Sequence, residues 1–585
     1  MHAIVKMRDR RNTSLSVSSN CSSNSSINEK RSGSPAPSSP LLPAPVTVTK
    51  ENVPKPSLRS RFMTATKILA AMSAALLVWH FLLCGRVMRL PIDVPDSGVP
   101  SLAGSDTLPN KPTALIVADK QGHSRWTMSI PHNATFPLRG QQYDDMCTQS
   151  EALRNSIAQT SRLVRTKDWL HMGYYYSADP TFMDVESAEQ AEALPMTKQA
   201  GDNVCESSLT FAFESGDGSF GRSLMLLWMS YGLAKKEGRA FFIDDSRWSY
   251  GKFTSYFAPP PAQSCERPPV HHILPCPHSA KHLVVSSSTQ RFTFGSAFKH
   301  EFLRHRQHGV EKSHRIFDLI RSGYKDLFKL VGEDASYASS RIAQFQKDDA
   351  AVVGMHVRRG DRHPLEYEFS KDYLPLERYS VAARQLLQSH RVSLPAEVQP
   401  QDDASHMSLL LASDDPEIFS SAELSQGASP FVMQKSQERI QLATKATLDV
   451  TSPALPIQEP GSAYVKHVEE NSGWEGGFYS ALFFAAGRPK QKAGSTSVEY
   501  TKQSSKLADH HDAPVPEQVM RMRELIGRAY VLDLAVLGAS DGLVCATSSA
   551  TCRLLGVMLG WDAVKDGKWV NVDDKRAWSW DGRRP

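Results

Sequence analysis

The stretch AAVVGMHVRRGDRHPLEYEF, residues 350–369, joins an apolar run to a dense group of charged side chains. The apolar part has the length and composition of a buried strand, and His356, Arg358 and Arg359 stand where that strand is expected to end. Two adjacent guanidinium groups can make bidentate hydrogen bonds to a diphosphate, and they stay charged at physiological pH. This pattern suits a reaction whose leaving group gains negative charge.

Two alternatives to a diphosphate-binding role exist for the same stretch. One is a solvated loop with local salt bridges, which is the more common place for a run of charges. The other is a cell-adhesion motif, Arg359-Gly360-Asp361, whose three residues recur by chance and here adjoin a buried strand.

Two further polar loops follow apolar runs later in the chain. LASDDP ends one run with Asp414 and Asp415, and CATSSATCR ends another with hydroxyl groups before a predicted helix. Hydroxyl groups near a helix N-terminus can receive phosphate oxygens, although either loop alone could simply cap a helix. Because the carboxyl ends of parallel strands meet at one edge of a sheet, three such loops together favour a ligand site there.

Strands and helices alternate around these loops. Residues 208–246 are predicted as one strand–helix–strand unit, and a second α/β block begins at residue 350. Helices are expected in LERYSVAARQLLQSH and PEQVMRMRELIGRAYVLDLAVLGAS, with strands in MSLLLASDDPEIF and DGLVC. The pattern indicates an α/β fold with parallel strands and ligands bound at their carboxyl ends.

The length of 585 residues is too great for a single core, so two folded domains and additional non-globular parts are expected. The predicted divisions are a disordered cytosolic tail at 1–65, a signal-anchor transmembrane helix at 66–86, a stem at 87–145, an N-terminal α/β lobe at 146–345 and a C-terminal lobe at 346–585, with surface insertions at 386–407 and 485–515.

The anchor rests on an uncharged run of 17 residues, Ile68–Cys84. As a helix it spans roughly 26 Å, enough for a thin bilayer. Lys and Arg are more frequent before the run than after it, which favours a cytosolic N-terminus and a single-pass type II topology. A short anchor fits the Golgi membrane, with the catalytic part in the lumen. The alternative is a buried core helix.

The composition is that of a globular protein, with 41% apolar and 22% charged residues. The net charge of +5 argues against a nucleic-acid partner that needs many phosphates neutralised, but it permits a small ligand that carries phosphate. Six of the eight cysteines follow the expected anchor, and this even number in an oxidising lumen predicts disulfides. None has the CxxC spacing of a zinc knuckle.

Four segments in the same order resemble the α-1,6-fucosyltransferases of glycosyltransferase family 23, which include core and nodulation enzymes. They are FFIDDSRWSYGKFTSYFAPPPAQSC, HVRRGDR, LASDDPEIF and VLDLAVLGASDGLVCATSSATCR, within roughly Cys205–Trp561. The resemblance implies a GT-B-like fold of two α/β lobes with a C-terminal Rossmann-like donor lobe. It further implies inverting transfer of L-fucose from GDP-fucose to a glycan, expected to be α-1,6 on N-glycans, without a metal or other cofactor.

The resemblance also implies roles for particular residues. Glu366 is the expected catalytic base, with Asp361 and Arg362 beside it, and Glu368 competes for the same role. The expected donor contacts are His356, Arg358, Arg359, Tyr250, Asp414, Asp415, Asp533, Ser549 and Tyr379. The implied disulfides are Cys205–Cys265 and Cys545–Cys552, which leaves Cys147 and Cys276 as the remaining pair.

The chain also departs from the family pattern. Arg362 stands where the family has a lysine and Ala550 where it has a glutamine, and Pro364 constrains the loop before Glu366. The helical region before the catalytic part and the SH3-like C-terminal domain of vertebrate members are short or missing, which leaves the acceptor open. Two alternatives are a protein O-fucosyltransferase-like enzyme and a catalytically silent, membrane-tethered glycan-binding protein.

Overall fold

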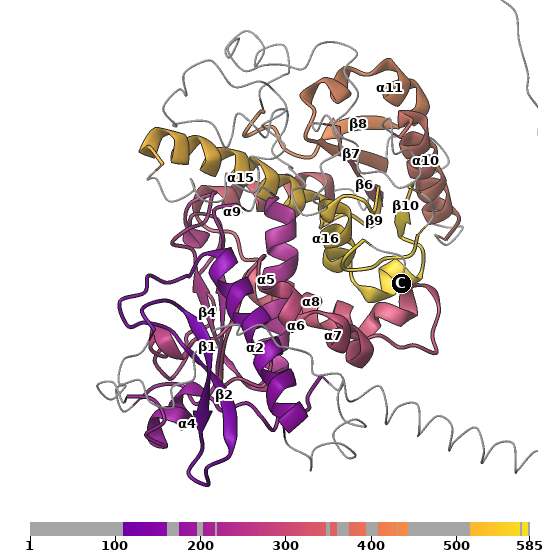
Figure 1. The fold of residues 1–585 in the computed structure, drawn as a ribbon. Coiled ribbons are helices and arrows are strands. Elements are labelled where there is room, and N and C mark those ends of the chain that lie inside the picture. The colour runs from indigo at the N-terminus through magenta and orange to yellow at the C-terminus, as the bar shows by residue number, and fades with distance from the viewer. Residues whose placement is uncertain are drawn as a thin grey trace, which may run out of the picture. The chain divides into compact units, whose positions relative to one another are not determined.

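The structure is a computed structural model. It describes residues 109–160, 175–195, 203–216, 219–346, 351–359, 374–393, 407–429, 431–442, 515–573 and 576–582. All of them belong to one compact unit, Asp96–Pro585. The architecture of this described part is mixed α/β with two parallel sheets, as predicted (Figure 1).

The first parallel sheet has three strands in the order β4-β3-β5. Its strands are β3 (Ser208–Ala212), β4 (Ala240–Asp244) and β5 (His282–Val285). Helix α5 (Phe220–Glu237) connects β3 to β4, so the strand–helix–strand unit predicted at residues 208–246 is present. The helix starts where the Ser219 side chain accepts from the Arg222 N–H, and it ends at Gly238, whose φ of +68° suits glycine.

The other helices described between residues 185 and 346 are α4 (Val185–Gln190), η1 (Phe253–Ser255), η2 (Val270–His272), α6 (Gln290–Thr293), α7 (Ser296–Phe302), η3 (Gly309–Ser313), α8 (His314–Leu327) and α9 (Gly332–Gln346).

The second parallel sheet has five strands in the order β10-β9-β6-β7-β8. They are β6 (Ala351–Val357), β7 (Met407–Ser413), β8 (Val432–Lys435), β9 (Gly542–Cys545) and β10 (Trp569–Asn571). The chain runs outward from β6 to β8 and then returns to the other side of β6 for β9 and β10. This reversal puts a topological switch point between β6 and β9, where open α/β sheets commonly bind ligands.

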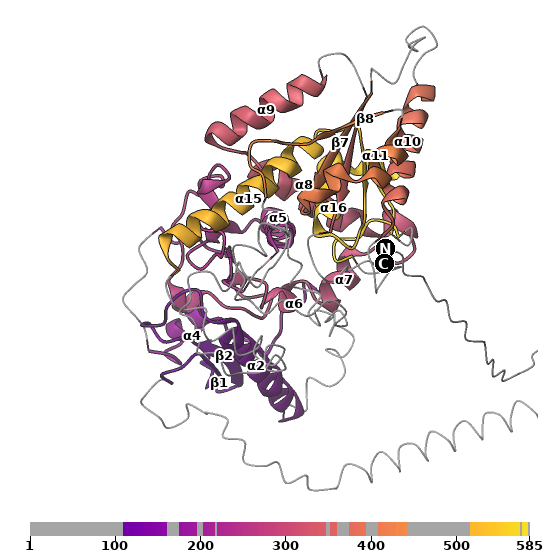
Figure 2. The same ribbon diagram turned by 90° about the horizontal axis from the view of Figure 1, so that it is seen from above.

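Helices cover both faces of the second sheet: α10 (Leu376–Ser393), η5 (Pro416–Ser420), α11 (Ala422–Ala428), α15 (Glu517–Leu537), α16 (Ala550–Leu559) and α17 (Trp561–Lys565). Successive residues of a strand point to opposite faces. Met355 and Val357 pack in a cluster with side chains of α10 and α11, whereas Val352 belongs to the cluster that includes α15 and α16. His356 therefore faces the α15 side. Figure 2 shows α15 alongside α9, which it contacts.

The segment 87–145 was expected to be a stem, and the structure differs from residue 109 onward. Strand β1 (Thr113–Ala118) pairs antiparallel with β2 (Ser124–Ser129), and both contact α2 (Gly140–Thr160). Leu115, Trp126 and Met128 are buried in the main core. The stem prediction is wrong here because a hairpin of two short strands gives no sustained hydrophobic period. Helix α10 likewise extends into the predicted insertion, as far as Ser393.

Three disulfides connect the six cysteines that follow the expected anchor: Cys147–Cys276, Cys205–Cys265 and Cys545–Cys552. The prediction of disulfides is thereby confirmed, and the last two pairs are those that the family resemblance implies. No helix within the described residues is long and apolar enough to cross a membrane. The expected anchor at 66–86 lies outside those residues.

Gly232 of α5 and Gly323 of α8 allow the two helices to pack closely. A Cβ at Gly232 would overlap the backbone of Leu319, which cannot move aside as a flexible side chain can. Gly232→Ala is therefore expected to lower the free energy of unfolding by about 3 kcal/mol, as in other overpacked cores. Gly216→Ala is the control, because a Cβ there meets nothing within 4 Å. Denaturant unfolding followed by circular dichroism measures both, and an equal loss in the two variants would contradict the packing argument.

Candidate functional site

A small cleft lies at the carboxyl ends of β6 and β7. Helix α15 forms one wall, and Thr551 of α16 reaches the same space. The polar residues that line it are His356, Ser413, Asp414, Tyr530, Asp533 and Thr551. Three of the sequence-predicted site residues, His356, Asp414 and Asp533, therefore meet in one cleft.

His356 is held at the last but one position of β6. Its side chain is buried, and its Nδ1 has no hydrogen-bond partner among the described residues. Burial, with a smaller contribution from the positive charge of Arg358, lowers the pKa of His356 to about 3. The imidazole is therefore neutral at physiological pH. An unpartnered buried polar atom that faces a cleft is suited to a hydrogen bond with a ligand.

Asp533 projects from α15 into the cleft. Removal of its carboxyl from water raises the pKa to about 7, although hydrogen bonds from Ser436 and Gln437 oppose this shift. The Ser436 hydroxyl, just beyond β8, donates to Asp533 Oδ1. Asp533 can therefore be protonated or charged near neutral pH, and it provides an acceptor whose state responds to what occupies the cleft.

The two predicted arginines follow β6 directly. Arg358 is buried at the strand end and lies close enough to His356 to influence its pKa. Arg359 joins neighbouring segments instead: its backbone N–H donates to Asp414 Oδ1 at 2.6 Å, and its guanidinium donates to the Leu374 carbonyl at 2.6 Å. The carboxylate of Asp414 thus fixes the start of the loop that leaves β6.

Asp415 acts as a helix cap. Its carboxylate accepts from the Glu417 N–H at 2.9 Å at the start of η5, and its own N–H donates to the Ser413 hydroxyl at 3.1 Å. This is the structural alternative that the sequence left open for the aspartate pair. Asp415 is not among the described residues that line the cleft.

The hydroxyl-bearing turn between β9 and α16 lies next to the strand end of β6, since His356 is registered with Cys545. Ser549 is the N-cap of α16, and its hydroxyl accepts from the Thr551 N–H at 3.2 Å. The Thr551 hydroxyl is in turn 3.1 Å from that of Tyr530. Ser549 and Thr551 are both buried. Because Thr551 lines the cleft, the N-terminal end of α16, with its partial positive charge, lies beside it.

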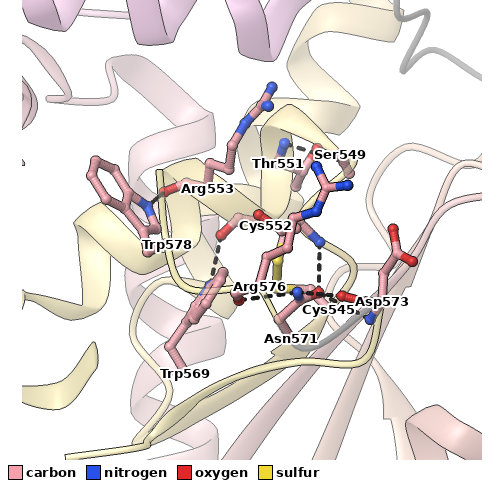
Figure 3. Close-up of a disulfide and its surroundings, with 11 residues drawn as sticks. Cys545, Ser549, Thr551, Cys552, Arg553, Trp569, Asn571, Asp573, Arg576 and Trp578 are labelled. Atoms are coloured by element: carbon pink, nitrogen blue, oxygen red, sulfur yellow. Dashed lines mark hydrogen bonds between the residues drawn. A yellow bond between two sulfur atoms is a disulfide. The ribbon is translucent and has the colours of Figure 1, made fainter. Parts of the chain in front are cut away.

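Figure 3 shows what holds this turn in place. The disulfide Cys545–Cys552 links the end of β9 to the first turn of α16. The Thr547 N–H donates to Asn571 Oδ1 at 2.9 Å, and the Trp569 ring donates to the Cys552 carbonyl at 2.9 Å. The turn is therefore braced by β10 and by a covalent bridge, which limits its motion.

The two predicted tyrosines lie elsewhere. Tyr379 is buried on α10, in the cluster on the opposite face of the sheet from His356. Tyr250 is buried in an aromatic group with Phe220, whose ring is 5.5 Å from that of Tyr530. Tyr250 is therefore near the cleft but is not among the described residues that line it. The expected catalytic residues Glu366, Asp361 and Arg362 lie outside the described residues.

Sequence reasoning missed Tyr530 and Thr551. On α15, residues 526, 530, 533, 534 and 537 all line the cleft, at the spacing of one helical face. The polar members Tyr530 and Asp533 interrupt an otherwise apolar stripe, and that interruption is the signal from which Tyr530 could have been found. Thr551 follows the predicted serine turn by two positions.

Comparisons with known proteins give a match only among solved structures, since no family model and no curated protein matches the chain. NodZ α-1,6-fucosyltransferase crystallised with GDP matches at 12% identity, over 60% of this chain and 91% of that one, with a TM-score of 0.26. The selenomethionine form of the fucosyltransferase NodZ from Bradyrhizobium gives the same values. Arabidopsis thaliana FUT1, as a mutant in complex with GDP, matches at 10% identity, over 68% and 78%, with a TM-score of 0.30.

The NodZ matches belong to the enzyme class that the sequence motifs resemble. The TM-scores are low, so this likeness by itself establishes neither a fold family nor a function for the chain.

Proposed function

We propose that this protein is a fucosyltransferase that moves L-fucose from GDP-fucose to a glycan acceptor, in a GT-B-like arrangement with residues 346–585 as the donor-binding lobe. The observation that carries the proposal is the convergence of three strand-end loops on one switch-point cleft. They bring together a neutral buried imidazole, a carboxylate with a raised pKa, a buried arginine and the start of a helix.

This combination matches the chemistry of a guanosine diphosphate. The edge of guanine carries two neighbouring N–H donors, which suit the carboxylate of Asp533, and His356 supplies a neutral hydrogen-bonding group beside it. The diphosphate needs positive charge, which Arg358 and the N-terminus of α16 at Ser549 provide. In this arrangement the base lies in the cleft and the diphosphate lies beside it, toward Arg358 and Ser549.

The proposed reaction is an inverting displacement. The oxygen of an acceptor hydroxyl forms a bond to the anomeric carbon of fucose while the bond from that carbon to the β-phosphate oxygen breaks, and GDP leaves. Glu366 takes the proton from the acceptor hydroxyl, with Glu368 as the competing candidate. Arg358 stabilises the charge that grows on the departing diphosphate, and such preorganised contacts are typically worth about 3 kcal/mol of barrier each. No step in this scheme uses a metal ion.

The proposed setting is the Golgi lumen, with a single-pass type II anchor at 66–86. The three disulfides support an oxidising compartment. The α-1,6 linkage on N-glycans is the expected product, because the core fucosyltransferases that the sequence motifs resemble make this linkage.

Calorimetric titration of the purified full-length protein with GDP, GDP-fucose and other nucleotide sugars tests the donor, with UDP-sugars as the control. Binding of GDP and GDP-fucose but not of UDP-sugars supports the proposal, and a protein that binds neither GDP nor GDP-fucose contradicts it. Transfer to N-glycans and to folded protein domains then separates the α-1,6 activity from protein O-fucosylation. Binding of glycan without GDP would indicate the silent glycan-binding alternative.

A further inference from the structure

Two adjacent histidines and a glutamate meet in the N-terminal lobe, on elements that contribute nothing to the cleft described above. His271 and His272 belong to η2, and Glu189 belongs to α4. His271 Nε2 lies 3.4 Å from Glu189 Oε1, and His272 Nε2 lies 3.0 Å from Glu189 Oε2. Their possible ligand atoms all lie within 4.8 Å of one another. Both imidazoles therefore turn the same nitrogen toward one carboxylate.

These distances agree with the edges of a metal coordination shell. Zinc bonds to imidazole nitrogen and carboxylate oxygen at about 2.0–2.2 Å, so neighbouring ligand atoms in a tetrahedral site are about 3.3 Å apart. The observed separations of 3.0 and 3.4 Å bracket that value.

The surrounding contacts fix the segments that carry these side chains. Lys281, just before β5, donates its N–H to Asp184 at 2.9 Å and its ammonium to Glu186 at 2.6 Å, which ties the start of α4 to the sheet. On the other side, the rings of His272 and His282 are nearly parallel, and His282 Nδ1 is 2.9 Å from the Ser208 hydroxyl. Glu189 and His272 are both buried, so the carboxylate is shielded from water.

We propose that Glu189, His271 and His272 form a binding site for a transition-metal dication such as Zn²⁺, with solvent completing the coordination. Two imidazoles select a transition metal over Mg²⁺ or Ca²⁺, which prefer oxygen ligands. The site stabilises the N-terminal lobe by linking α4 to η2. It lies apart from the transfer chemistry and does not depend on the proposed function.

The test uses full-length protein without a polyhistidine tag, stripped with EDTA and then titrated with Co²⁺ and Zn²⁺. We expect about one equivalent of Co²⁺ to give visible d–d absorption that Zn²⁺ abolishes, and we expect Zn²⁺ to raise the unfolding temperature. His272→Asn and Glu189→Gln should each weaken binding by at least about 100-fold, since even outer-shell changes cost 10- to 100-fold.

His278→Asn is the matched control. His278 Nε2 lies 2.9 Å from Glu237 Oε1 in the same lobe, in a single histidine–carboxylate pair with similar shielding. This variant should keep full metal affinity. A wild-type protein that takes up no more Co²⁺ than the His271→Asn/His272→Asn double variant would overturn the proposal, and the cluster would then be a hydrogen-bonded pair only. The wild-type titration decides the matter alone if the variants fail to fold by circular dichroism.

Discussion

Replacement of Arg358 by alanine is expected to reduce fucose transfer by about 10²- to 10³-fold, mainly in kcat. The reason is electrostatic: a preorganised donor aimed at charge that develops in the transition state has this typical value. Arg358 is buried at the carboxyl end of β6, in the part of the sheet next to the Ser549 turn, where the diphosphate is proposed to lie. The change is measured as GDP released from GDP-fucose in the presence of acceptor.

Two further variants make this result specific. Arg358→Lys keeps the charge but loses the planar fork, so it should recover only a small part of the activity. Arg521→Ala removes an exposed arginine of α15 that forms an ion pair with the exposed Glu517, and it should leave transfer unchanged. Near-normal turnover in a folded Arg358→Ala protein would show that the donor site is elsewhere.

Asp533→Asn is expected to weaken GDP binding by about 10- to 100-fold, because hydrogen bonds to a charged group are worth about 1.5–3 kcal/mol. The wild-type affinity should also depend on pH. The carboxyl has a pKa of about 7 in the free protein, and only its charged form accepts both N–H groups of guanine. Below pH 7 the binding of GDP must therefore release a proton, and the affinity should fall about tenfold for each unit by which the pH is lowered. Titration calorimetry across pH measures both effects.

The same group makes stability depend on pH in the opposite sense. The folded pKa of Asp533 is raised from 3.8 to about 7, so the folded state keeps a proton that the unfolded state releases. Between these values the contribution of Asp533 to stability falls as pH rises, and above about pH 7 it stays constant. The variant should lose this slope. Glu517→Gln, on the exposed face of the same helix, should change neither the slope nor the GDP affinity.

Much of the fold follows from local patterns. The runs that became β6, β7 and β9 are apolar and end in polar loops, and parallel strands must bring those loops to one edge. The meeting of His356 and Asp414 could therefore be predicted from the sequence. In α15 the sequence shows Tyr530 and Asp533 only as polar interruptions of an apolar stripe, and the family resemblance implied Asp533 alone. Which face of the helix lies on the sheet depends on packing with distant residues such as Ser436.

The failures have physical causes as well. Tyr379 was assigned by resemblance alone, and it lies on the opposite face of the sheet from His356 because the whole of α10 packs on that face. The hairpin β1–β2 was not predicted because two short strands give no sustained hydrophobic period, and the packing of both strands against α2 is not visible in the sequence. The Glu189–His271–His272 cluster joins residues more than 80 positions apart, a pairing that only the folded chain makes visible.

The three disulfides differ greatly in the length of chain they enclose, with sequence separations of 129, 60 and 7. A bridge that encloses a long segment restricts the unfolded chain strongly, whereas one across seven residues restricts it little. Cys545–Cys552 thus adds less to overall stability than to the rigidity of one turn. Both of its cysteines are fully buried, so a Cys545→Ser/Cys552→Ser replacement is the way to remove this bridge, and it would loosen the turn more than it lowers the stability of the whole protein.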